Sequence, residues 1–234
     1  MLQELINKSL RGQDEKKKDR VRSGKFSPSM LGMCYRKQIL NRANVPQSNP
    51  PDDRSLRVFK CGQLFHDFVQ SFIDENKCIE VHCESEDFNG FADIVTEDTV
   101  YDIKSVHSKS FWYSKKPGYD VKKEKFNNWL QLAYYADVLK KEKMVLVFIS
   151  KDDMCIEEYE QPLHDWQIEL VKEFTNLKTQ WDKKPELPPA EPRTKWDCGY
   201  GSNRCQYYNH CKEIETNANR EHPFRESKSN RKSK

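Results

Sequence analysis

The chain lacks any long apolar run. Its longest uninterrupted apolar segment is Met144 to Ile149, far short of the roughly 20 residues that cross a bilayer as a helix. The first residues, Met1 to Lys8, also lack the apolar centre of a secretory signal. We therefore expect an intracellular, cytoplasmic protein that does not contact membranes. In such reducing surroundings the eight cysteines are not expected to form a disulfide framework.

Apolar residues are scarce overall, at 36% of the chain against 33% charged residues, which indicates a compact core with charged flanks. The net charge of +3 hides an uneven distribution: residues 1–25 hold eight Lys/Arg against four acids, and residues 219–234 hold six against two. Charged ends of this kind are typically solvated. We predict a basic, flexible arm over 1–25, a folded domain over 26–212, and a basic, disordered tail over 213–234.

Hydrophobic periodicity predicts five strands and several helices in the folded domain. The strands are expected near 78–84, 90–95, 99–104, 144–150 and 154–160. Helices are expected from Ser27 to about Leu40, and near 54–76, 124–141 and 163–182, with a loop over 44–53 and a proline-rich linker over 185–192. This order of elements predicts an α/β fold in which helices flank a mixed sheet.

Two aspartates in the predicted sheet carry the strongest functional signal. Asp93 ends the segment Gly90-Phe91-Ala92-Asp93, and Asp102-Ile103-Lys104 follows on the next predicted strand. A hairpin would bring the carboxylates close together, with Lys104 on the same strand face as Asp102. Two carboxylates suit a hard divalent cation, and an ammonium group beside them can orient a water or stabilise a charged transition state. The pattern is typical of a metal-dependent phosphodiesterase.

Two predicted helices carry polar residues that could complete such a site. Gly62, His66 and Gln70 share one helical stripe, so His66 is a candidate third ligand. Alternatively, the stripe is a polar border of the helix, with His66 as an ordinary half-buried histidine. Gln131 and Tyr135 lie four residues apart on another helix, where they either support the site or form the edge of an amphipathic face.

The combined pattern resembles a known family. Its parts are Gly62-x3-His66, Gly90-x2-Asp93, Asp102-x-Lys104 and Gln131-x3-Tyr135, together with Cys34 before them and Cys198-x6-Cys205-x5-Cys211 after them. Over residues 27–211 this order resembles the RecB-type branch of the restriction-endonuclease-like PD-(D/E)xK nucleases. The cysteines resemble those of its iron–sulfur members, of the AddB and CRISPR-adaptation exonuclease type.

The resemblance implies a role for each matching position. His66, Asp93, Asp102 and the carbonyl of Ile103 would bind Mg²⁺ or Mn²⁺, Lys104 would position or activate the attacking water, and Gln131 and Tyr135 would support the site and the scissile phosphate. A further acid before the hairpin is common in such nucleases, and Glu80, Glu84 and Glu86 are equal candidates for it.

The resemblance also implies that Cys34, Cys198, Cys205 and Cys211 ligate a [4Fe–4S] cluster that ties the two ends of the domain together. Zn²⁺ is the alternative occupant of a four-cysteine site, and a third interpretation is a buried Cys34 with three idle thiols. The remaining cysteines, Cys61, Cys78, Cys83 and Cys155, are expected to be inert core residues.

The segment after Lys104 indicates the substrate. It interleaves lysines with aromatic residues and carries seven lysines against two acids between residues 104 and 125. Lysines match phosphates, and aromatic rings stack on unpaired bases without reading sequence. The alternative is a charged loop whose rings face the core. We predict a DNA-binding track that includes Lys109, Trp112, Tyr113, Lys115 and Lys116.

These observations favour a metal-dependent deoxyribonuclease, most simply an exonuclease on single-stranded or frayed DNA ends. A helicase or a CRISPR-adaptation integrase is the expected kind of protein partner. Two other functions stay open from the sequence: a non-catalytic DNA-end-binding subunit of a repair, recombination or CRISPR-adaptation complex, and a zinc-stapled interaction protein.

Overall fold

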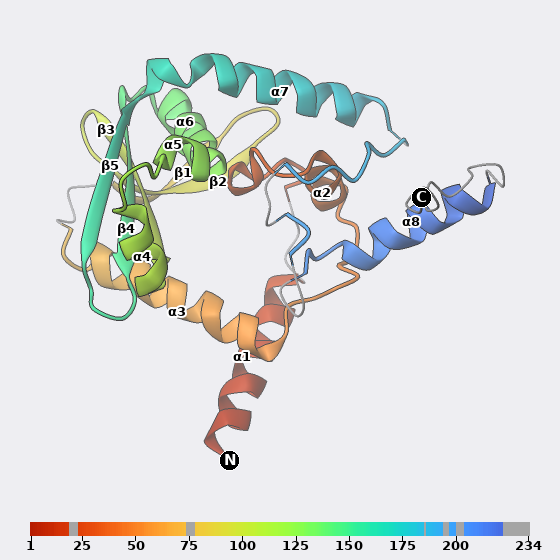
Figure 1. Ribbon diagram of the computed structural model, residues 1–234, viewed down its shortest axis with the longest axis horizontal. Helices are drawn as coiled ribbons and strands as arrows, with labels where there is room; N and C mark the ends of the chain where they lie inside the picture. The colour runs from red at the N-terminus through yellow and green to blue at the C-terminus, as the bar shows by residue number, and fades with distance from the viewer. Residues whose placement is uncertain (19–22, 74–77, 185, 194–196, 200–203, 222–234) are drawn as a thin grey trace, which may run out of the picture.

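A five-stranded mixed sheet forms the centre of the protein, shown as a computed structural model in Figure 1. The structure describes residues 1–18, 23–73, 78–184, 186–193, 197–199 and 204–221. The strands lie in sequence order across the sheet, as β1 (Cys78–Glu84), β2 (Asn89–Val95), β3 (Thr99–Val106), β4 (Lys143–Ser150) and β5 (Ile156–Pro162). All neighbours are antiparallel except β3 and β4. The predicted strands and the α/β fold class are confirmed, with strand ends shifted by at most two residues.

The parallel pair requires a crossover, because parallel strands cannot be joined by a tight turn. The chain between β3 and β4 forms α4 (Ser108–Ser114), α5 (Val121–Glu124) and α6 (Phe126–Leu139). Eight consecutive residues of α6, Trp129 to Ala136, are buried, so this helix is enclosed all round. The prediction of a helix near 124–141 is confirmed, whereas the helix α4 was not predicted.

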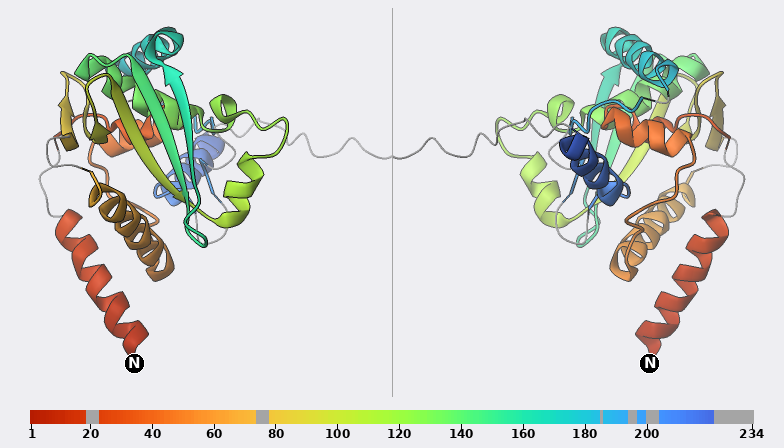
Figure 2. Two further views of the ribbon diagram at one scale, coloured as in Figure 1. Left: turned by 90° about the vertical axis from the view of Figure 1, so that its left-hand side faces the viewer. Right: turned by 90° about the vertical axis from the view of Figure 1, so that its right-hand side faces the viewer.

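Helices cover both faces of the sheet (Figures 1 and 2). On one face, α6 and α7 (Gln167–Asp182, preceded by the short 3₁₀ helix η2 at Leu163–Asp165) enclose the larger core, which includes Trp129, Tyr134 and Phe148. On the other face, α3 (Asp53–Gln70) packs Phe65 and Val69 against a smaller core. Since β4 lies between both layers, seven of its eight residues are buried.

The expected helix from Ser27 to Leu40 is interrupted. Ser27 does precede a helical turn with proline at its first position, but this turn is the 3₁₀ helix η1 (Pro28–Met30). The chain then passes through Gly32, whose φ of +76° favours glycine, before α2 (Tyr35–Arg42) begins. A Cβ at Gly32 would also lie 3.1 Å from the Cα of Asn127, so close packing on α6 sets the break.

The predicted helix over 54–76 is shorter in the structure. The carboxylate of Asp52 caps α3 by accepting a hydrogen bond from the Ser55 N–H. The helix ends at Gln70, and the last predicted residues, 74–76, lie outside the described residues.

The N-terminal arm, which was predicted to be flexible, is helical over most of its length. Residues 2–18 form the helix α1 (Leu2–Lys18), which lies beside the start of α3 and projects from the body (Figures 1 and 2). Arg11 contacts Asp53 at 2.8 Å, and the guanidinium of Arg57 donates to Asn7, which is buried. These contacts to α3 are tertiary, so local composition did not reveal them.

The C-terminal region contains one more helix than predicted. α8 (Tyr208–Glu221) extends beyond residue 213, where a disordered tail was expected. The remaining tail, residues 222–234, lies outside the described residues, and so does residue 185 of the predicted linker. Within the part of the chain that the structure describes, no helix is both long and apolar enough to cross a membrane.

Candidate metal-dependent active site

The site lies where β2 and β3 separate. The two strands pair only at Ile94–Tyr101 and Val95–Val100, so the ladder stops just before Asp93 and Asp102 would face each other. Side chains two residues apart on a regular strand face the same side of the sheet. In β2 this pattern breaks at Asp93, because Ala92 packs in the larger core and Ile94 in the smaller core on the other face. The carboxylate of Asp93 therefore turns into the gap and accepts a 2.7 Å hydrogen bond from the Ile103 N–H.

Asp102 and Lys104 form a close pair on β3, as the sequence predicted. The Lys104 Nζ lies 2.7 Å from the Asp102 Oδ1. Asp102 is almost fully buried at 1% exposure, whereas the Lys104 side chain is 32% exposed. The second carboxylate oxygen of Asp102, Oδ2, is buried without a hydrogen-bond partner, although a buried carboxylate oxygen is costly unless it binds something.

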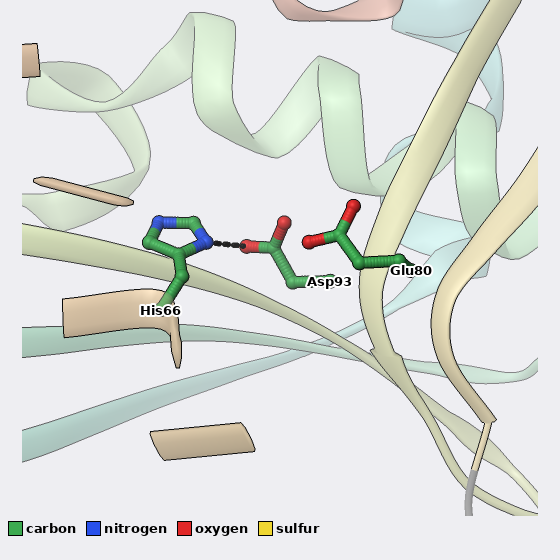
Figure 3. A group of neighbouring side chains, drawn as sticks. All are labelled: His66, Glu80 and Asp93. Carbon is green, nitrogen blue, oxygen red and sulfur yellow. Dashed lines mark ion pairs between the residues drawn. The ribbon is translucent and has the colours of Figure 1, made fainter. Parts of the chain in front are cut away.

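His66, Glu80 and Asp93 each direct one ligand atom to a common point (Figure 3). These atoms all lie within 4.8 Å of one another, and the His66 Nδ1 is 3.6 Å from the Asp93 Oδ2. Glu80 adopts a positive φ of +49°, which is uncommon for a residue other than glycine. The imidazole comes from α3, while the two carboxylates come from neighbouring strands of the sheet.

The site holds more negative charge than its protein surroundings neutralise. Burial, followed by repulsion from Asp102, raises the pKa of Asp93 to about 6, against the attraction of Lys104 and His66. Burial lowers the pKa of Lys104, but the carboxylates of Asp102 and Asp93 outweigh this, and the pKa is raised overall. Lys104 is therefore a cation at neutral pH, and Asp93 holds a charge that a bound cation would stabilise.

Gln131 and Tyr135 lie behind Asp102 on α6. The Gln131 Nε2 donates to the Asp102 Oδ1 at 3.1 Å, and Tyr135 lies near Gln131 one turn further along the helix. Both side chains are buried, at 7% and 3% exposure. They can therefore hold Asp102 in position, but neither is accessible to a scissile phosphate. Gly90 makes room for Tyr135, since a Cβ there would lie 2.9 Å from the tyrosine hydroxyl.

A cavity of about 620 Å³ opens onto the site. Its lining includes His66, Glu80 and Lys104, and successive turns of α3 form one wall. Gly62 also lines it, but a Cβ at Gly62 would meet only the Ser105 Oγ at 3.8 Å. Packing alone therefore does not require this glycine.

The donor set suits a divalent cation. Three carboxylates and one imidazole are close together, one carboxylate oxygen has no partner, and repulsion between Asp93 and Asp102 is only partly offset by Lys104 and His66. Oxygen ligands suit Mg²⁺ and Mn²⁺, and an imidazole nitrogen also suits Mn²⁺. The carbonyl of Ile103 as a ligand stays a prediction.

One of the three candidate acids joins the site, together with Gln70 from the predicted polar stripe and Lys151, which the sequence did not indicate. Glu80 is the acid that joins Asp93, while Glu84 pairs with Lys25 at 2.9 Å instead. Gln70 donates to the Glu80 Oε1 at 3.0 Å, and Lys151 lines the cavity from the end of β4. Counting residues outward from the β1–β2 turn could have identified Glu80. Ile79 pairs with Ile94 and Val81 with Ala92, which leaves Glu80 opposite Asp93.

Four cysteines from the two ends of the domain lie near one another. Burial raises the pKa values of the Cys198, Cys205 and Cys211 thiols, and the neighbouring Cys34 raises each of them further. The Cys205 N–H also bonds to the Cys198 carbonyl at 3.1 Å. The charge of Lys37 lowers the pKa of Cys205 and so partly offsets this rise.

Buried hydrogen bonds attach this cysteine group to the core. The Asp197 carboxylate accepts from the N–H groups of Cys34 and Arg193, at 3.1 and 2.7 Å. The Arg193 guanidinium reaches both carboxylate oxygens of Glu173 on α7 at 2.7 Å. Glu173 is only 2% exposed and also accepts from the Gly32 N–H. The segment carrying Cys198 is thus joined to the segment carrying Cys34.

The other four cysteines do not all lie in the core. Cys83 is fully buried, as expected, but Cys61 and Cys155 are half-buried and Cys78 is exposed. The expectation of a core position is therefore wrong for Cys78, which begins the edge strand β1.

The predicted DNA-binding track is divided between surface and core. Trp112 and Tyr113 on α4 are 51% and 57% exposed, whereas Phe111 is buried. Lys116 lies 5.6 Å from the centre of the Tyr113 ring, and Lys109 and Tyr113 line a cavity of about 550 Å³. Lys115 instead pairs with Glu157 at 2.6 Å, so its charge is partly neutralised.

Comparison with known proteins identifies a shared fold. No protein-family model matches the chain, and a search of curated proteins found no match. The crystal structure of a protein named SSO0001 is similar, with a TM-score of 0.54 at 18% identity over 85% of this chain and 91% of that one. An alkaline exonuclease, LHK-Exo from Laribacter hongkongensis, aligns with a TM-score of 0.44 at 14% identity, over 69% of this chain and 91% of that one. Its complex with dAMP gives 0.45 at 13%, over 68% and 90%.

Proposed function

We propose that the chain is a divalent-metal-dependent DNA nuclease that hydrolyses phosphodiester bonds. One observation carries the proposal: Asp93, Glu80 and His66 converge beside Asp102 and Lys104 at the separation of two strands. A structural role does not explain this arrangement, because it buries carboxylates whose charges repel one another. Such strain is typical of catalytic sites.

His66, Glu80, Asp93 and Asp102 would hold the cation, either Mn²⁺ or Mg²⁺. When bound, it would supply Lewis-acid stabilisation of the phosphate charge and a more acidic water. Because Asp93 and Asp102 repel each other, a divalent positive charge beside them would be favourable. Gln70 and the Ile103 N–H fix the orientations of Glu80 and Asp93 through hydrogen bonds of 3.0 and 2.7 Å.

Lys104 acts as a fixed positive charge. Its pKa is raised by Asp102 and Asp93 against the effect of burial, so it does not serve as a general base at neutral pH. Its Nζ is anchored by Asp102, and the side chain is partly exposed and lines the cavity. From there the ammonium orients the attacking water by hydrogen bonding and stabilises charge that develops on the phosphate.

The preferred substrate is single-stranded DNA or a frayed DNA end, cleaved as an exonuclease. Support comes from Trp112 and Tyr113, which expose their rings beside Lys109 and Lys116. Exposed rings stack on unpaired bases whatever the sequence, and the lysines contribute attraction to phosphates. A helicase or an integrase of a CRISPR-adaptation complex is the proposed type of partner.

The same proposal places a structural [4Fe–4S] cluster between Cys34, Cys198, Cys205 and Cys211. Cys34 lies near enough to Cys198, Cys205 and Cys211 to raise the pKa values of their thiols. Four cysteine thiolates can hold either an iron–sulfur cluster or Zn²⁺, so metal content decides between the two. Bound iron would give a brown protein, and bound zinc a colourless one.

The test compares cleavage and binding in the same variants. Asp102→Asn and Lys104→Ala should abolish cleavage of an end-labelled oligonucleotide while both proteins remain folded and bind DNA, because both groups act mainly on the transition state. Glu84→Gln is a matched control, since this acid lies near His82 and Lys25, away from the site. Cleavage at the normal rate in Asp102→Asn would refute the assigned site. DNA binding by the unmodified protein with no cleavage under any metal condition would favour the non-catalytic subunit instead.

A further inference from the structure

One exposed aromatic ring lies where three hollows of the surface meet. Phe59 on α3 is 62% exposed. It lines the active-site cavity, a second cavity of about 650 Å³ beside the cysteine group, and a third of about 200 Å³ between α1 and α3. Single exposed apolar residues are common, so exposure by itself says little. The relevant feature is that the ring lies between the active-site cavity and a second large cavity, where it could contact a strand that passes from one to the other.

Helix geometry aligns Phe59 with the metal-binding histidine. Phe59 and His66 are seven residues apart, which is close to two full helical turns and about 10 Å along the axis. Gly62 and Gln63, between them, line the same active-site cavity. One face of α3 therefore leads from the candidate metal ligand to the ring without an intervening large apolar side chain.

The cavity beyond Phe59 has the chemistry of a polyanion site. Its lining includes the cations Lys37, Arg54 and Arg204, with Asn49 and Gln206 as further polar groups. Of its two acids, Asp197 is engaged by the N–H groups of Cys34 and Arg193. The other acid, Asp14, also has a partner. A nucleic-acid strand that leaves the active site in this direction would meet an aromatic face first and positive charge next.

We propose that Phe59 is a positioning residue that stacks on a base next to the scissile phosphate. This inference rests on the proposed nuclease function and adds the direction of the strand, along α3 toward Lys37 and Arg54. Stacking by Phe59 would fix the register of the strand over His66 and Lys104. It requires an unpaired base, so it also favours single-stranded DNA over a closed duplex.

The first experiment measures binding of a labelled single-stranded oligonucleotide in an Asp102→Asn background, which removes cleavage. Phe59→Ala should weaken binding roughly 5- to 100-fold, the range for loss of one stacked base, and Phe59→Trp should restore it. Phe68→Ala is the control, because Phe68 is 45% exposed on the same helix and lies nine residues away, on the opposite face. Equal effects of Phe59→Ala and Phe68→Ala would overturn the proposal.

A scan of single abasic sites along the oligonucleotide separates stacking from general destabilisation. With Phe59 present, one abasic position next to the cleaved bond should weaken binding much more than its neighbours do. In Phe59→Ala this position-specific loss should disappear, while the dependence of binding on salt concentration stays the same. In Arg54→Gln the salt dependence should become shallower, since one phosphate contact is lost.

A flat abasic profile with Phe59 present would overturn the proposal while leaving the nuclease function intact. If the unmodified chain binds no single-stranded DNA, both the inference and the proposed substrate are wrong.

Discussion

Replacing Asp93 by asparagine should stabilise the metal-free protein at neutral and alkaline pH. The Asp93 side chain is 12% exposed, and burial together with the charge of Asp102 raises its pKa from 3.8 to about 6. Asparagine removes the charge but keeps an oxygen that accepts the Ile103 N–H, now 2.7 Å from the carboxylate. The variant thus removes the unfavourable charge with little change to the backbone contact.

The sign and size of the effect follow from proton linkage. Because the folded-state pKa is higher than the unfolded-state value, the folded protein binds more protons between them, and stability falls as pH rises through this range. Above the folded-state pKa, the difference between the two pKa values lowers the free energy of unfolding by about 3 kcal/mol. For a protein of this size, that is roughly 6–12 °C in melting temperature. At pH 4.5 only about a third of this difference should remain.

The assay is thermal unfolding by circular dichroism in EDTA at pH 4.5, 6 and 8. Asp93→Asn should melt higher than the unmodified protein at pH 8, and the gap should narrow as the pH falls. Added Mn²⁺ should reverse the order at pH 8, because only the unmodified protein keeps the charged Asp93 carboxylate as a ligand. A variant that is less stable at pH 8, or a gap that does not change with pH, would refute the electrostatic reasoning.

Three further results are expected. EDTA should stop cleavage, and Mn²⁺ should restore it at least as well as Mg²⁺, because an imidazole belongs to the donor set. Cleavage that persists at the same rate in EDTA would exclude the assigned site. Cys34→Ala should remove iron and colour and sharply lower the melting temperature. Cys83→Ala should keep the iron and lower the free energy of unfolding by roughly 1–3 kcal/mol through lost packing. Iron content per chain is measured in both variants, and equal iron content would contradict the assignment of Cys34 as a ligand. Glu173→Gln should lower the melting temperature, because it leaves the charge of Arg193, paired with it at 2.7 Å, without its carboxylate partner; an unchanged melting temperature would show that this ion pair contributes nothing.

The sequence predicted the sheet and the pairing of Asp102 with Lys104, because both depend on local alternation. Residues two apart on one strand share a face, and the 2.7 Å contact between them confirms it. Only the register of the β1–β2 hairpin distinguishes Glu80 from the other candidate acids, because β2 changes faces at Asp93 and Glu80 takes an unusual backbone conformation. Neither feature has a local composition signal.

Elements that depend on tertiary contacts were predicted least well. α1 was expected to be flexible, but it is held by contacts to α3, such as Arg11 with Asp53 at 2.8 Å. The break before α2 depends on the packing of Gly32 against Asn127 on another helix. The burial of Gln131 and Tyr135 behind Asp102 was not predictable from helical spacing alone.

The most direct test of the central claim is digestion of an end-labelled single-stranded oligonucleotide by the purified chain. Mn²⁺ and EDTA are compared, and Asp102→Asn, purified in the same way, controls for contaminating nucleases. We predict cleavage with Mn²⁺, none with EDTA, and none with Asp102→Asn under either condition. Equal cleavage by the unmodified chain and Asp102→Asn, or no cleavage by a folded, metal-loaded chain that binds the oligonucleotide, would contradict the account.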